Sequence, residues 1–368
     1  MDRTTLGNSG IEVSAIGFGG MRIPRVDESE AMAALEKALE LGITLFETGH
    51  GYGAGSSQKM IGRATEGVRD DVVLFNKANI GGVESCDEIR SQMDRALKDE
   101  RTDHFDCFSL WGVNNHEIFE GARKSGFFDE LRRMREEGLT RLVGITTHAC
   151  AEDIISFLDT EDLDVVTLKY NLLTRRQEPA IAELGRRGVG CLVMNPLAGG
   201  MVANPGSEVR QIFEEAGVPP AVLGLRYHTS NPGVSCPIPG MQSAAEVAEN
   251  VAAGTKAPLT DEEKRLVEAV QKALENLGED FCTGCGYCMP CPEGVGIPSI
   301  FTLWNMQRGY GADTYTKLEY LKIREQRHWA DYGGKSAEAC IECGECEEKC
   351  PNSLPIREML KKAHDDLS

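Results

Sequence analysis

Residues 72–77 read Val72-Val73-Leu74-Phe75-Asn76-Lys77 and stay apolar up to the last two positions. A short run rich in Val, Leu and Phe is typical of a strand buried on both faces of a parallel sheet. A segment with helical periodicity, Asp87–Leu97, follows this run, and a second apolar run, Phe105–Leu110, comes next. This order of strand, helix and strand predicts a parallel sheet whose crossover connections are helices.

The same alternation extends over about the first 255 residues. The apolar runs there are Val13–Gly19, Ile43–Glu47, Val72–Lys77, Phe105–Leu110, Thr140–Ile145, Val165–Leu168, Val189–Met194 and Gly233–Ile238. Eight strands alternating with eight helical segments predict an α/β fold of the (β/α)8 TIM barrel type rather than an open doubly wound sheet. Before the first strand, Arg3–Ser14 is expected to form a hairpin that plugs one end of the barrel.

The chain changes character after residue 278. Pro258–Leu277 opens with a capping box at Thr260–Glu263 and predicts a long helix. Beyond it, runs of cysteine bracket a segment, Ile300–Tyr332, that is expected to be helical. We therefore expect a barrel at residues 1–255, a connecting helix at 256–280 and a mostly helical domain at 281–368.

Eight of the 13 cysteines form two motifs near the C-terminus. These are Cys282-x2-Cys285-x2-Cys288-x2-Cys291-Pro292 and Cys340-x2-Cys343-x2-Cys346-x3-Cys350-Pro351. Three thiolates at this spacing can hold one cubane cluster, and the fourth, followed by Pro, reaches the other cluster in two-cluster ferredoxins. The motifs predict a ferredoxin-like domain with two [4Fe-4S] clusters. One cluster is expected on Cys282, Cys285, Cys288 and Cys350, and the other on Cys340, Cys343, Cys346 and Cys291.

A pair of zinc sites is the alternative for these cysteines, although zinc usually takes two separated Cys-x2-Cys pairs. The last gap of the first motif is one residue shorter than the usual ferredoxin spacing, which makes the cross-ligation by Cys291 the part of the assignment to check. The five other cysteines are expected to be buried thiols that behave as small apolar side chains. They are Cys86, Cys107, Cys150, Cys191 and Cys236.

Charge and composition exclude several classes of function. The chain has 39 Lys and Arg against 58 Asp and Glu, a net charge of −19, which repels phosphate backbones and anionic lipids. We therefore expect neither a nucleic-acid partner nor a membrane partner, although an acidic face could select a basic electron-transfer partner. Residues 1–11 contain no apolar signal region, and the cysteine count is odd, so we expect a reducing, cytoplasmic location.

Polar residues at the C-terminal ends of barrel strands are expected to line the mouth of the barrel. The second strand is followed by His50 and Tyr52, and the third ends in Lys77. An ammonium group lowers the pKa of a neighbouring phenol, and the phenol can then pass a proton to a carbonyl oxygen as hydride arrives. Tyr52 and Lys77 are therefore candidates for a proton-transfer pair.

Residues 1 to about 255 resemble an aldo-keto reductase along their whole length. The resemblance rests on Leu6–Gly10, Ile16–Arg22, Phe46–Gly53, Asn195–Gly200 and Ile238–Asn250, which occur in family order. With the cysteine motifs, the chain resembles the ferredoxin-fused branch of that family. The resemblance implies an oxidoreductase that acts on a small substrate at the barrel mouth.

The family's catalytic tetrad of Asp, Tyr, Lys and His implies roles for four residues. Tyr52 and Lys77 match, Glu47 takes the Asp position, and Trp111 takes the His position. An indole donates one N–H but cannot shuttle a proton. His50 or His148 could supply an imidazole from adjacent loops, although a solvated loop histidine is the alternative for both.

The resemblance also implies positions for a nicotinamide cofactor. The residues at those positions are Thr146, Thr147, Thr167, Met194, Asn195 and Asn250. The residues that usually hold the 2′-phosphate fall at Gly240 and Glu246. A carboxylate beside a phosphate argues against tight NADPH binding and leaves NADH open.

Two functions remain open. The first is an oxidoreductase that interconverts a small carbonyl and alcohol, with electrons exchanged through two [4Fe-4S] clusters and NAD(P)H. The second is an electron-transfer subunit whose barrel is a scaffold and whose partner is a redox protein. Nicotinamide moves two electrons as hydride whereas a cluster moves one, so joining them requires a flavin or a two-electron substrate step.

Overall fold

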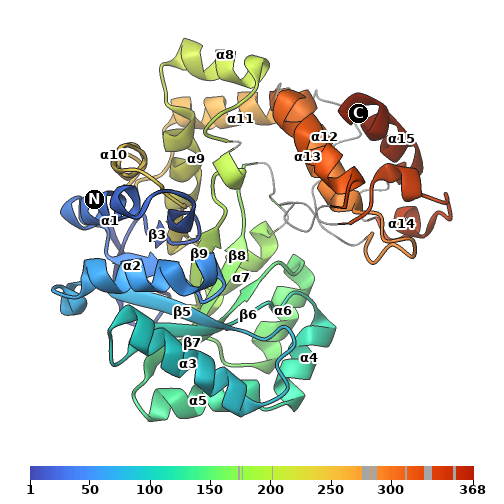
Figure 1. Ribbon diagram of the computed structural model, residues 1–368. Helices are drawn as coiled ribbons and strands as arrows, with labels where there is room; N and C mark the ends of the chain where they lie inside the picture. The colour runs from blue at the N-terminus through green and yellow to red at the C-terminus, as the bar shows by residue number, and fades with distance from the viewer. Residues whose placement is uncertain are drawn as a thin grey trace. The chain divides into compact units, whose positions relative to one another are not determined.

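The computed structural model describes residues 1–172, 175, 177–200, 202–275, 282, 288–310, 313–326, 334–350 and 354–368. These residues divide into two compact units (Figure 1). The first unit is Met1–Gly199 with Ala221–Asp261, and the second is Gly200–Pro220 with Glu262–Ser368. Each unit is described by itself.

The first unit is built around an eight-stranded parallel sheet in which the strands follow one another in chain order. A parallel bridge between Gly19 and Gly240, with hydrogen bonds from Gly17 N to Pro237 O and from Gly19 N to Pro239 O, joins the first strand to the last. The predicted TIM barrel is confirmed. Its strands are β3 (Phe18–Gly19), β4 (Leu45–Glu47), β5 (Val73–Asn79), β6 (Phe105–Trp111), β7 (Thr140–Thr147), β8 (Val165–Lys169), β9 (Gly190–Met194) and β10 (Cys236–Ile238).

The first barrel strand is shorter than predicted. Val13 and Ser14 belong instead to β2 (Glu12–Ser14), which pairs antiparallel with β1 (Arg3–Thr5) in the predicted hairpin. The chain turns after this hairpin because the Ser14 hydroxyl donates to Ile16 O at 2.7 Å and accepts from Thr44 N at 2.9 Å. The predicted strand Val13–Gly19 therefore comprises a hairpin strand, a turn and the two residues of β3.

Helices cover the outside of the barrel and pack on it through their apolar faces (Figure 1). They are α1 (Glu28–Glu40), α2 (Ser56–Thr65), α3 (Cys86–Glu100), α4 (His116–Lys124), α5 (Phe127–Glu136), α6 (Ala151–Thr160), α7 (Glu178–Arg187), α9 (Pro220–Thr229) and α10 (Ala244–Val251). Cys107, Cys191 and Cys236 are buried in this unit, as predicted. Cys86 and Cys150 are only partly buried, because Cys86 is the first residue of α3 and Cys150 precedes α6.

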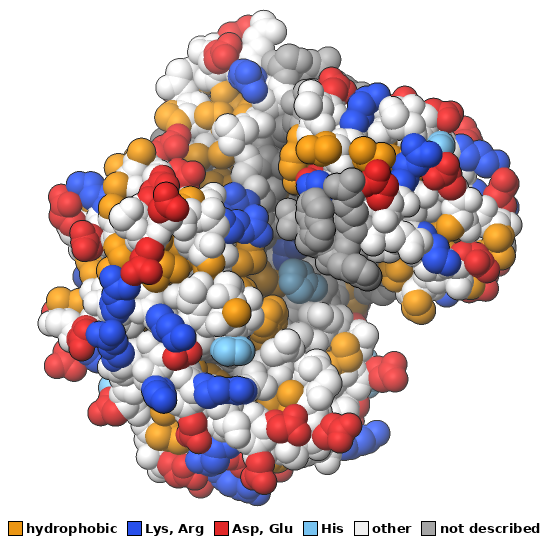
Figure 2. Space-filling view, viewed as in Figure 1, with side chains coloured by type: hydrophobic (Ala, Val, Ile, Leu, Met, Phe, Trp, Pro, Cys, Tyr) orange, Lys and Arg blue, Asp and Glu red, His pale blue; other side chains and the backbone are white. Residues whose placement is uncertain are grey.

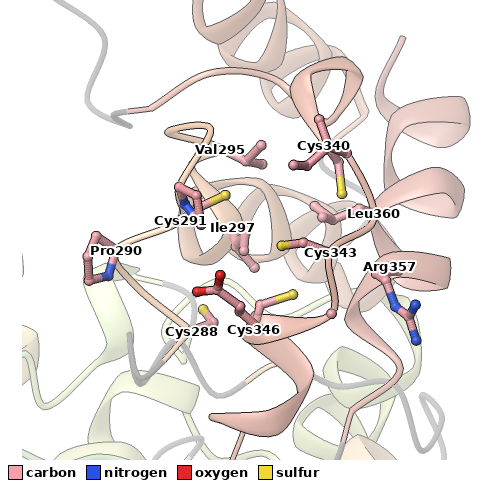
Figure 3. Close-up of a pocket in the computed structure, with 14 residues that line it drawn as sticks. Cys288, Pro290, Cys291, Val295, Ile297, Cys340, Cys343, Cys346, Arg357 and Leu360 are labelled. Atoms are coloured by element: carbon pink, nitrogen blue, oxygen red, sulfur yellow. The ribbon is translucent and has the colours of Figure 1, made fainter.

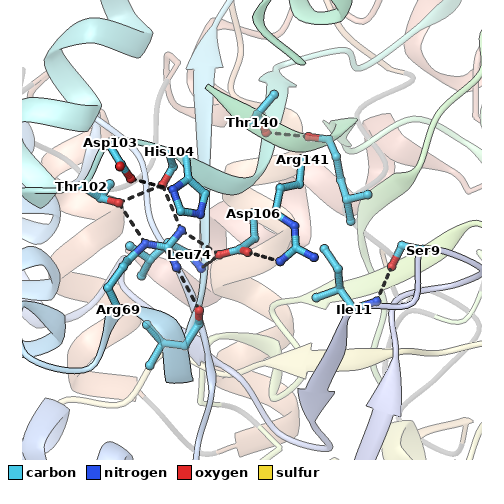
Figure 4. Close-up of polar contacts among 12 residues, drawn as sticks. Ser9, Ile11, Arg69, Leu74, Thr102, Asp103, His104, Asp106, Thr140 and Arg141 are labelled. Carbon is cyan, nitrogen blue, oxygen red and sulfur yellow. Dashed lines mark hydrogen bonds and ion pairs between the residues drawn. The ribbon is translucent and has the colours of Figure 1, made fainter. Parts of the chain in front are cut away.

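A buried carboxylate ties three strands together near the N-terminal ends of β6 and β7 (Figure 4). Asp106, on β6, receives hydrogen bonds from Arg69 Nη2 at 3.0 Å, Arg141 Nη1 at 2.9 Å and the backbone N–H of Leu74 at 2.9 Å. These partners stabilise Asp106, since burying an isolated carboxylate without a partner costs free energy. This end of a TIM barrel serves stability rather than chemistry.

The second unit is mostly helical in its described residues, as the sequence predicts. Its helices are α8 (Ser207–Ala216), α11 (Asp261–Glu275), α12 (Ile297–Tyr310), α13 (Asp313–Arg324), α14 (Glu345–Glu348) and α15 (Ile356–Leu367). Phe301 and Trp304 of α12, Tyr320 of α13 and Met359 of α15 belong to its hydrophobic core. The predicted domain boundaries at 255 and 280 remain predictions.

None of the helices in the described part of the chain combines the length and the apolar character that a membrane span requires. On the face shown in Figure 2, acidic and basic side chains are interspersed over the outer surface of the barrel unit.

Candidate active site and thiol-lined cavity

The C-terminal ends of the barrel strands bring several predicted site residues into one layer. Lys77 lies two positions after Phe75 on β5, and Met194 lies two positions after Leu192 on β9. Phe75 and Leu192 belong to the hydrophobic cluster inside the barrel, and side chains two apart on a strand share a face. The strand register also aligns Trp111 with Thr146 and Thr146 with Thr167.

Lys77 joins the two groups that the sequence places beside it. Its Nζ donates to a carboxylate oxygen of Glu47 and to the hydroxyl oxygen of Tyr52, the latter at 2.7 Å. Lys77 and Glu47 are 2% and 3% exposed, so this ion pair is shielded from water. Tyr52 lies in a short 3-10 turn, Tyr52–Gly55, that follows β4. The predicted grouping of Tyr52, Lys77 and Glu47 is thus present in the structure.

The pKa of Tyr52 is raised, in contrast to the expectation that Lys77 would lower it. Burial of the phenol and the negative charge of Glu47 both raise the pKa, and together they outweigh the lowering by Lys77. Burial lowers the pKa of Lys77 because it disfavours the charged ammonium. The interactions with Glu47 and Tyr52 outweigh burial, so the Lys77 pKa is raised. The expectation failed because the phenol is buried, and Glu47 in addition compensates the positive charge that was to act on it.

Trp111 packs against both members of the Tyr–Lys pair. Its ring lies edge-on to Tyr52 with ring centroids 5.8 Å apart, and Lys77 Nζ lies 5.5 Å from the indole centroid. Glycines let the loop after β4 approach this group, since a Cβ at Gly51 would lie 2.9 Å from a Trp111 ring carbon. The indole therefore forms a wall of the site beside the Tyr–Lys pair.

The two loop histidines do not hydrogen-bond to Tyr52 among the contacts of the described residues. His50 is exposed beside Gly55. His148 is also exposed, and its backbone N–H donates to Asn114 Oδ1 at 3.0 Å. Desolvation by neighbouring protein atoms, with the positive charges of Lys169 and Lys77, lowers the pKa of His148 and keeps its imidazole neutral at pH 7.

The two adjacent threonines that end β7 differ in what their hydroxyls do. The Thr147 hydroxyl donates to Val113 O and accepts from Ala149 N, so it holds the loop. The Thr146 hydroxyl is buried and has no hydrogen-bond partner among the described residues, and the same holds for the hydroxyl of Thr167 on β8. Buried polar groups normally have partners, so these two hydroxyls are candidates for ligand contacts.

The remaining cofactor positions are spread around the barrel. Met194 is half-buried at the end of β9, and the next residue, Asn195, is exposed with a φ of 56°. Asn250 is buried on α10. Glu246, at the predicted 2′-phosphate position, accepts from Gln242 N at 2.8 Å and helps to cap α10, so its carboxylate has a structural use.

A buried acid beside the site has no signature in the sequence. Asn76, the neighbour of Lys77, donates through Nδ2 to Oε1 of Glu100, the last residue of α3. Glu100 is 1% exposed, and its Oε2 has no hydrogen-bond partner in the part of the chain that the structure describes. Burial raises the pKa of Glu100 well above its ordinary value, with Glu47 adding to the shift. A glutamate at a helix end ordinarily reaches solvent, so the sequence does not predict that Glu100 is buried. Only the packing of α2 against α3 in the structure shows this burial.

The second unit contains a cavity whose wall is rich in thiols (Figure 3). The cavity and its solvent-filled opening together hold about 370 Å³ that protein atoms do not fill. The cysteines on its wall are Cys288, Cys291, Cys340, Cys343 and Cys346. Among the described residues, no three His, Cys, Asp or Glu side chains surround a point that would suit a single metal ion.

The cavity unites cysteines from both sequence motifs. Cys291 faces the same space as Cys340, Cys343 and Cys346, which is the set predicted for one cluster across a large sequence separation. Cys288, predicted for the other cluster, also reaches this wall. Of the other predicted ligands, Cys282 and Cys350 are partly buried, and Cys285 lies outside the described residues. The chemistry of the thiol set fits an iron–sulfur cluster.

Family models match both parts of the chain. Residues 15–272 match the model described as aldo/keto reductase family. Residues 281–354 match the model described as 4Fe-4S dicluster domain, which implies two clusters.

Similar proteins cover the barrel part of the chain. An L-galactose dehydrogenase of Arabidopsis thaliana is 28% identical over 309 residues, which cover 74% of this chain and 95% of that protein. An uncharacterized oxidoreductase of Bacillus subtilis is 22% identical over 304 residues, covering 74% and 97%. The holo form of an aldo-keto reductase from Bacillus halodurans is 26% identical, with a TM-score of 0.64, and covers 73% of this chain and 96% of that one.

Proposed function

Because the chain belongs to the aldo-keto reductase family and is an oxidoreductase fused to a 4Fe-4S dicluster domain, we propose that its barrel reduces a small carbonyl substrate with Tyr52 as the proton donor. The observation that carries the proposal is the bridge that Lys77 makes between Tyr52 and Glu47. A phenol held by a buried ammonium has a fixed position and direction for donating its proton.

The raised pKa of Tyr52 favours the direction of reduction. A phenol that keeps its proton at neutral pH can donate it to the oxygen of a carbonyl as negative charge develops there. The buried Lys77 then stabilises the phenolate that remains, because an ammonium acts strongly where water is excluded. The reverse reaction needs the phenolate beforehand, so alcohol oxidation should require a higher pH than carbonyl reduction.

Trp111 has a different role from the histidine that the family places there. It packs on Tyr52 and Lys77 and excludes water from one side of the pair, which strengthens the electrostatic interactions within it. Its indole N–H can donate one hydrogen bond to a substrate oxygen but cannot exchange a proton. Proton transfer in this barrel therefore rests on Tyr52.

A nicotinamide is the hydride source that best suits the barrel. The unpartnered hydroxyls of Thr146 and Thr167 would bind its polar end, and Met194 and Asn195 would lie beside it. Bound there, the cofactor would supply the two electrons and the hydrogen that reach the substrate carbon. Glu246 disfavours the 2′-phosphate of NADPH, so we expect NADH to bind more tightly.

The dicluster domain is proposed to exchange electrons with a redox protein, one electron at a time. Cys291, Cys340, Cys343 and Cys346 would hold one cluster in the thiol-lined cavity, and Cys282, Cys285, Cys288 and Cys350 the other. When bound, the clusters would supply one-electron transfer, and the cysteines would fix their position.

The test of the barrel chemistry is Tyr52→Phe. We expect carbonyl reduction to fall by about 10²- to 10⁴-fold, since this is the usual contribution of a general acid. NADH binding should stay unchanged. Tyr227→Phe is the matched control, because the Tyr227 hydroxyl is hydrogen-bonded to Tyr170 and Glu178, away from Tyr52 and Lys77. Full turnover by Tyr52→Phe would contradict the proposal.

A barrel that serves only as a scaffold is the second candidate, and Trp111 and Met194 at two family positions favour it. Anaerobic titration with NADH and NADPH, followed through cluster absorbance, separates the two functions. If neither nucleotide binds to protein with intact clusters, the scaffold function replaces the reductase.

A further inference from the structure

The inside of the barrel differs in charge from the chain as a whole. Alternate positions of each strand face inward, on the side of the hydrophobic cluster that contains Phe75 and Leu192. The charged side chains among the inward-facing positions of the eight strands are Glu47, Lys77 and Lys169. Glu47 and Lys77 pair with each other, so Lys169 gives these positions a net positive charge, whereas the chain carries −19. A positive barrel mouth in an acidic protein favours an anionic ligand.

Lys169 stands at the open end of the barrel. It is the last residue of β8 and is half-buried. It lies four positions after Val165, which belongs to the hydrophobic cluster inside the barrel, and two positions after Thr167, so the three side chains face the same way. Two residues of a strand span about 7 Å, so Lys169 lies one step nearer to solvent than the buried Thr167 hydroxyl, which has no hydrogen-bond partner among the described residues.

The neighbours of Lys169 belong to the site already described. In the strand register, Lys169 lies beside Met194 on β9, which is one of the positions proposed for the nicotinamide. Thr167, directly below it on β8, is another. A ligand group that binds to the Lys169 ammonium would therefore belong to a molecule at the solvent side of the nicotinamide, which is where a substrate approaches.

The electrostatics of His148 place the ammonium groups of Lys169 and Lys77 near one region of the mouth. Desolvation lowers the pKa of His148 most, and the charges of Lys169 and Lys77 lower it further, to about 4. The imidazole is neutral at pH 7 and adds no positive charge there. Lys77 already donates to Glu47 and Tyr52. An ammonium has three N–H donors, so Lys169 can hold a ligand anion in addition to a protein partner.

The phosphates of a nucleotide do not account for this lysine. The positions predicted for the 2′-phosphate, Gly240 and Glu246, follow β10, and β9 separates β10 from β8 in the sheet. A phosphate group also carries a charge of about −1.5 to −2 at pH 7, whereas a carboxylate carries the single negative charge that one ammonium compensates. The position and the charge of Lys169 therefore favour a carboxylate that belongs to the substrate.

We propose that Lys169 is a specificity-determining residue and that the substrate is an oxo acid, a carbonyl compound that also carries a carboxylate. The carboxylate would bind to the Lys169 ammonium while the carbonyl oxygen faces Tyr52. In the reduction, the carbonyl carbon receives hydride, the carbonyl oxygen receives the proton of Tyr52, and the carboxylate is unchanged. This inference rests on the proposed carbonyl reduction and adds the class of substrate.

The experiment measures binding by calorimetry, with and without NAD⁺, so that no turnover is needed. Two probe pairs cover a short and a long spacing between hydroxyl and carboxylate: lactate with lactamide, and para-(hydroxymethyl)benzoate with its amide. We expect the unaltered protein to bind the carboxylate of at least one pair about tenfold more tightly than the neutral amide, since this is the effect of a hydrogen bond to a charged group. Lys169→Met should abolish the preference, and Lys169→Arg should retain most of it.

Lys98→Met is the matched control, because Lys98 is exposed in the last turn of α3 and its loss changes the net charge equally. This control should leave the affinities for all four probes unchanged. Equal affinities for carboxylate and amide in both pairs, or a Lys169→Met variant that keeps the preference, would overturn the inference. Tighter binding of para-(hydroxymethyl)phenyl phosphate than of the benzoate would also overturn it. So would a Lys169→Met variant that weakens NADH binding by the same factor, since the lysine would then serve the cofactor.

The proposed reduction is tested separately through Tyr52. If Tyr52→Phe keeps full turnover while the carboxylate preference is present, Tyr52 is not the proton donor and the assignment of Lys169 stands. If Tyr52→Phe loses turnover while carboxylate and amide bind equally, the reduction stands and the assignment of Lys169 falls.

Discussion

The barrel site and the thiol-lined cavity both hold reactive side chains in position, but they do so by different means. In the barrel, Glu47, Lys77 and Trp111 lie on parallel strands whose backbones are hydrogen-bonded to both neighbours. In the second unit, Cys343 lies in a loop and Cys346 in a helix of four residues. The barrel holds its site through the sheet. In the second unit, the ion pairs of Glu342 with Lys361 and of Glu347 with Arg357 attach the segment around Cys343 to α15.

This difference indicates how each part of the molecule should respond when its ligand is lost. A side chain on a strand keeps its position when its ligand is absent, because the backbone hydrogen bonds of the sheet do not depend on the ligand. A set of thiols on loops gains much of its order from what it binds, since metal binding is coupled to folding. We therefore expect ligand loss to change the second unit and to leave the barrel intact.

The largest effect is expected from Cys346→Ala. With one of the four thiols of its cluster removed, the iron content should fall from about eight to about four atoms per chain. Iron analysis of anaerobically purified protein, with circular dichroism of the barrel, measures both halves of the comparison. Cys236→Ala, which removes a buried barrel thiol, should retain all of the iron. Protein that carries zinc in place of iron would contradict the cluster assignment.

A smaller effect is expected from Asp106→Ala at the opposite end of the barrel. Loss of this carboxylate leaves Arg69 and Arg141 without their shared partner and should cost about 3–5 kcal/mol of unfolding free energy. Denaturant unfolding measures it. Glu137→Ala removes an ion pair with Arg90 in which the Glu137 side chain is 49% exposed. This variant should lose less than about 1 kcal/mol of unfolding free energy. Equal losses in the two variants would show that burial does not decide the strength of these pairs.

Glu100→Gln is expected to change stability in the opposite direction, with an effect that is near zero at pH 4 and grows with pH. Because burial raises the Glu100 pKa in the folded protein, its contribution to stability is present below the ordinary pKa of 4.5 and is lost as the pH rises toward the folded-state pKa. The amide can accept from Asn76 but does not ionise. The variant should match the parent near pH 4 and gain up to about 1.4 kcal/mol per pH unit above it.

Thermal unfolding at several pH values checks this gain. A difference between the two proteins that does not change with pH would mean that Glu100 stays ionised in the fold. Such a result would also place a second negative charge close to Glu47, which the raised pKa of Glu100 argues against.

Much of the barrel could be predicted from local patterns. The eight apolar runs are the barrel strands, because a strand buried on both faces must be apolar along its length. The prediction that Val13 and Ser14 belong to the first barrel strand was wrong. A hairpin strand and a barrel strand have the same local composition, and only the turn at Ser14 separates them. The pairing of Tyr52 with Lys77 followed from strand-end positions, whereas the place of Glu47 beside them followed from the resemblance to the family's tetrad.

The sequence by itself determined the barrel, the candidate pair of Tyr52 and Lys77 and the thiol motifs, because each depends on periodicity or spacing along the chain. Only the tertiary structure decided the electrostatics. It set the raised pKa of Tyr52, the use of Thr147 by its own loop and the burial of Glu100. These properties depend on how many protein atoms and charges surround a group, and distant segments supply them.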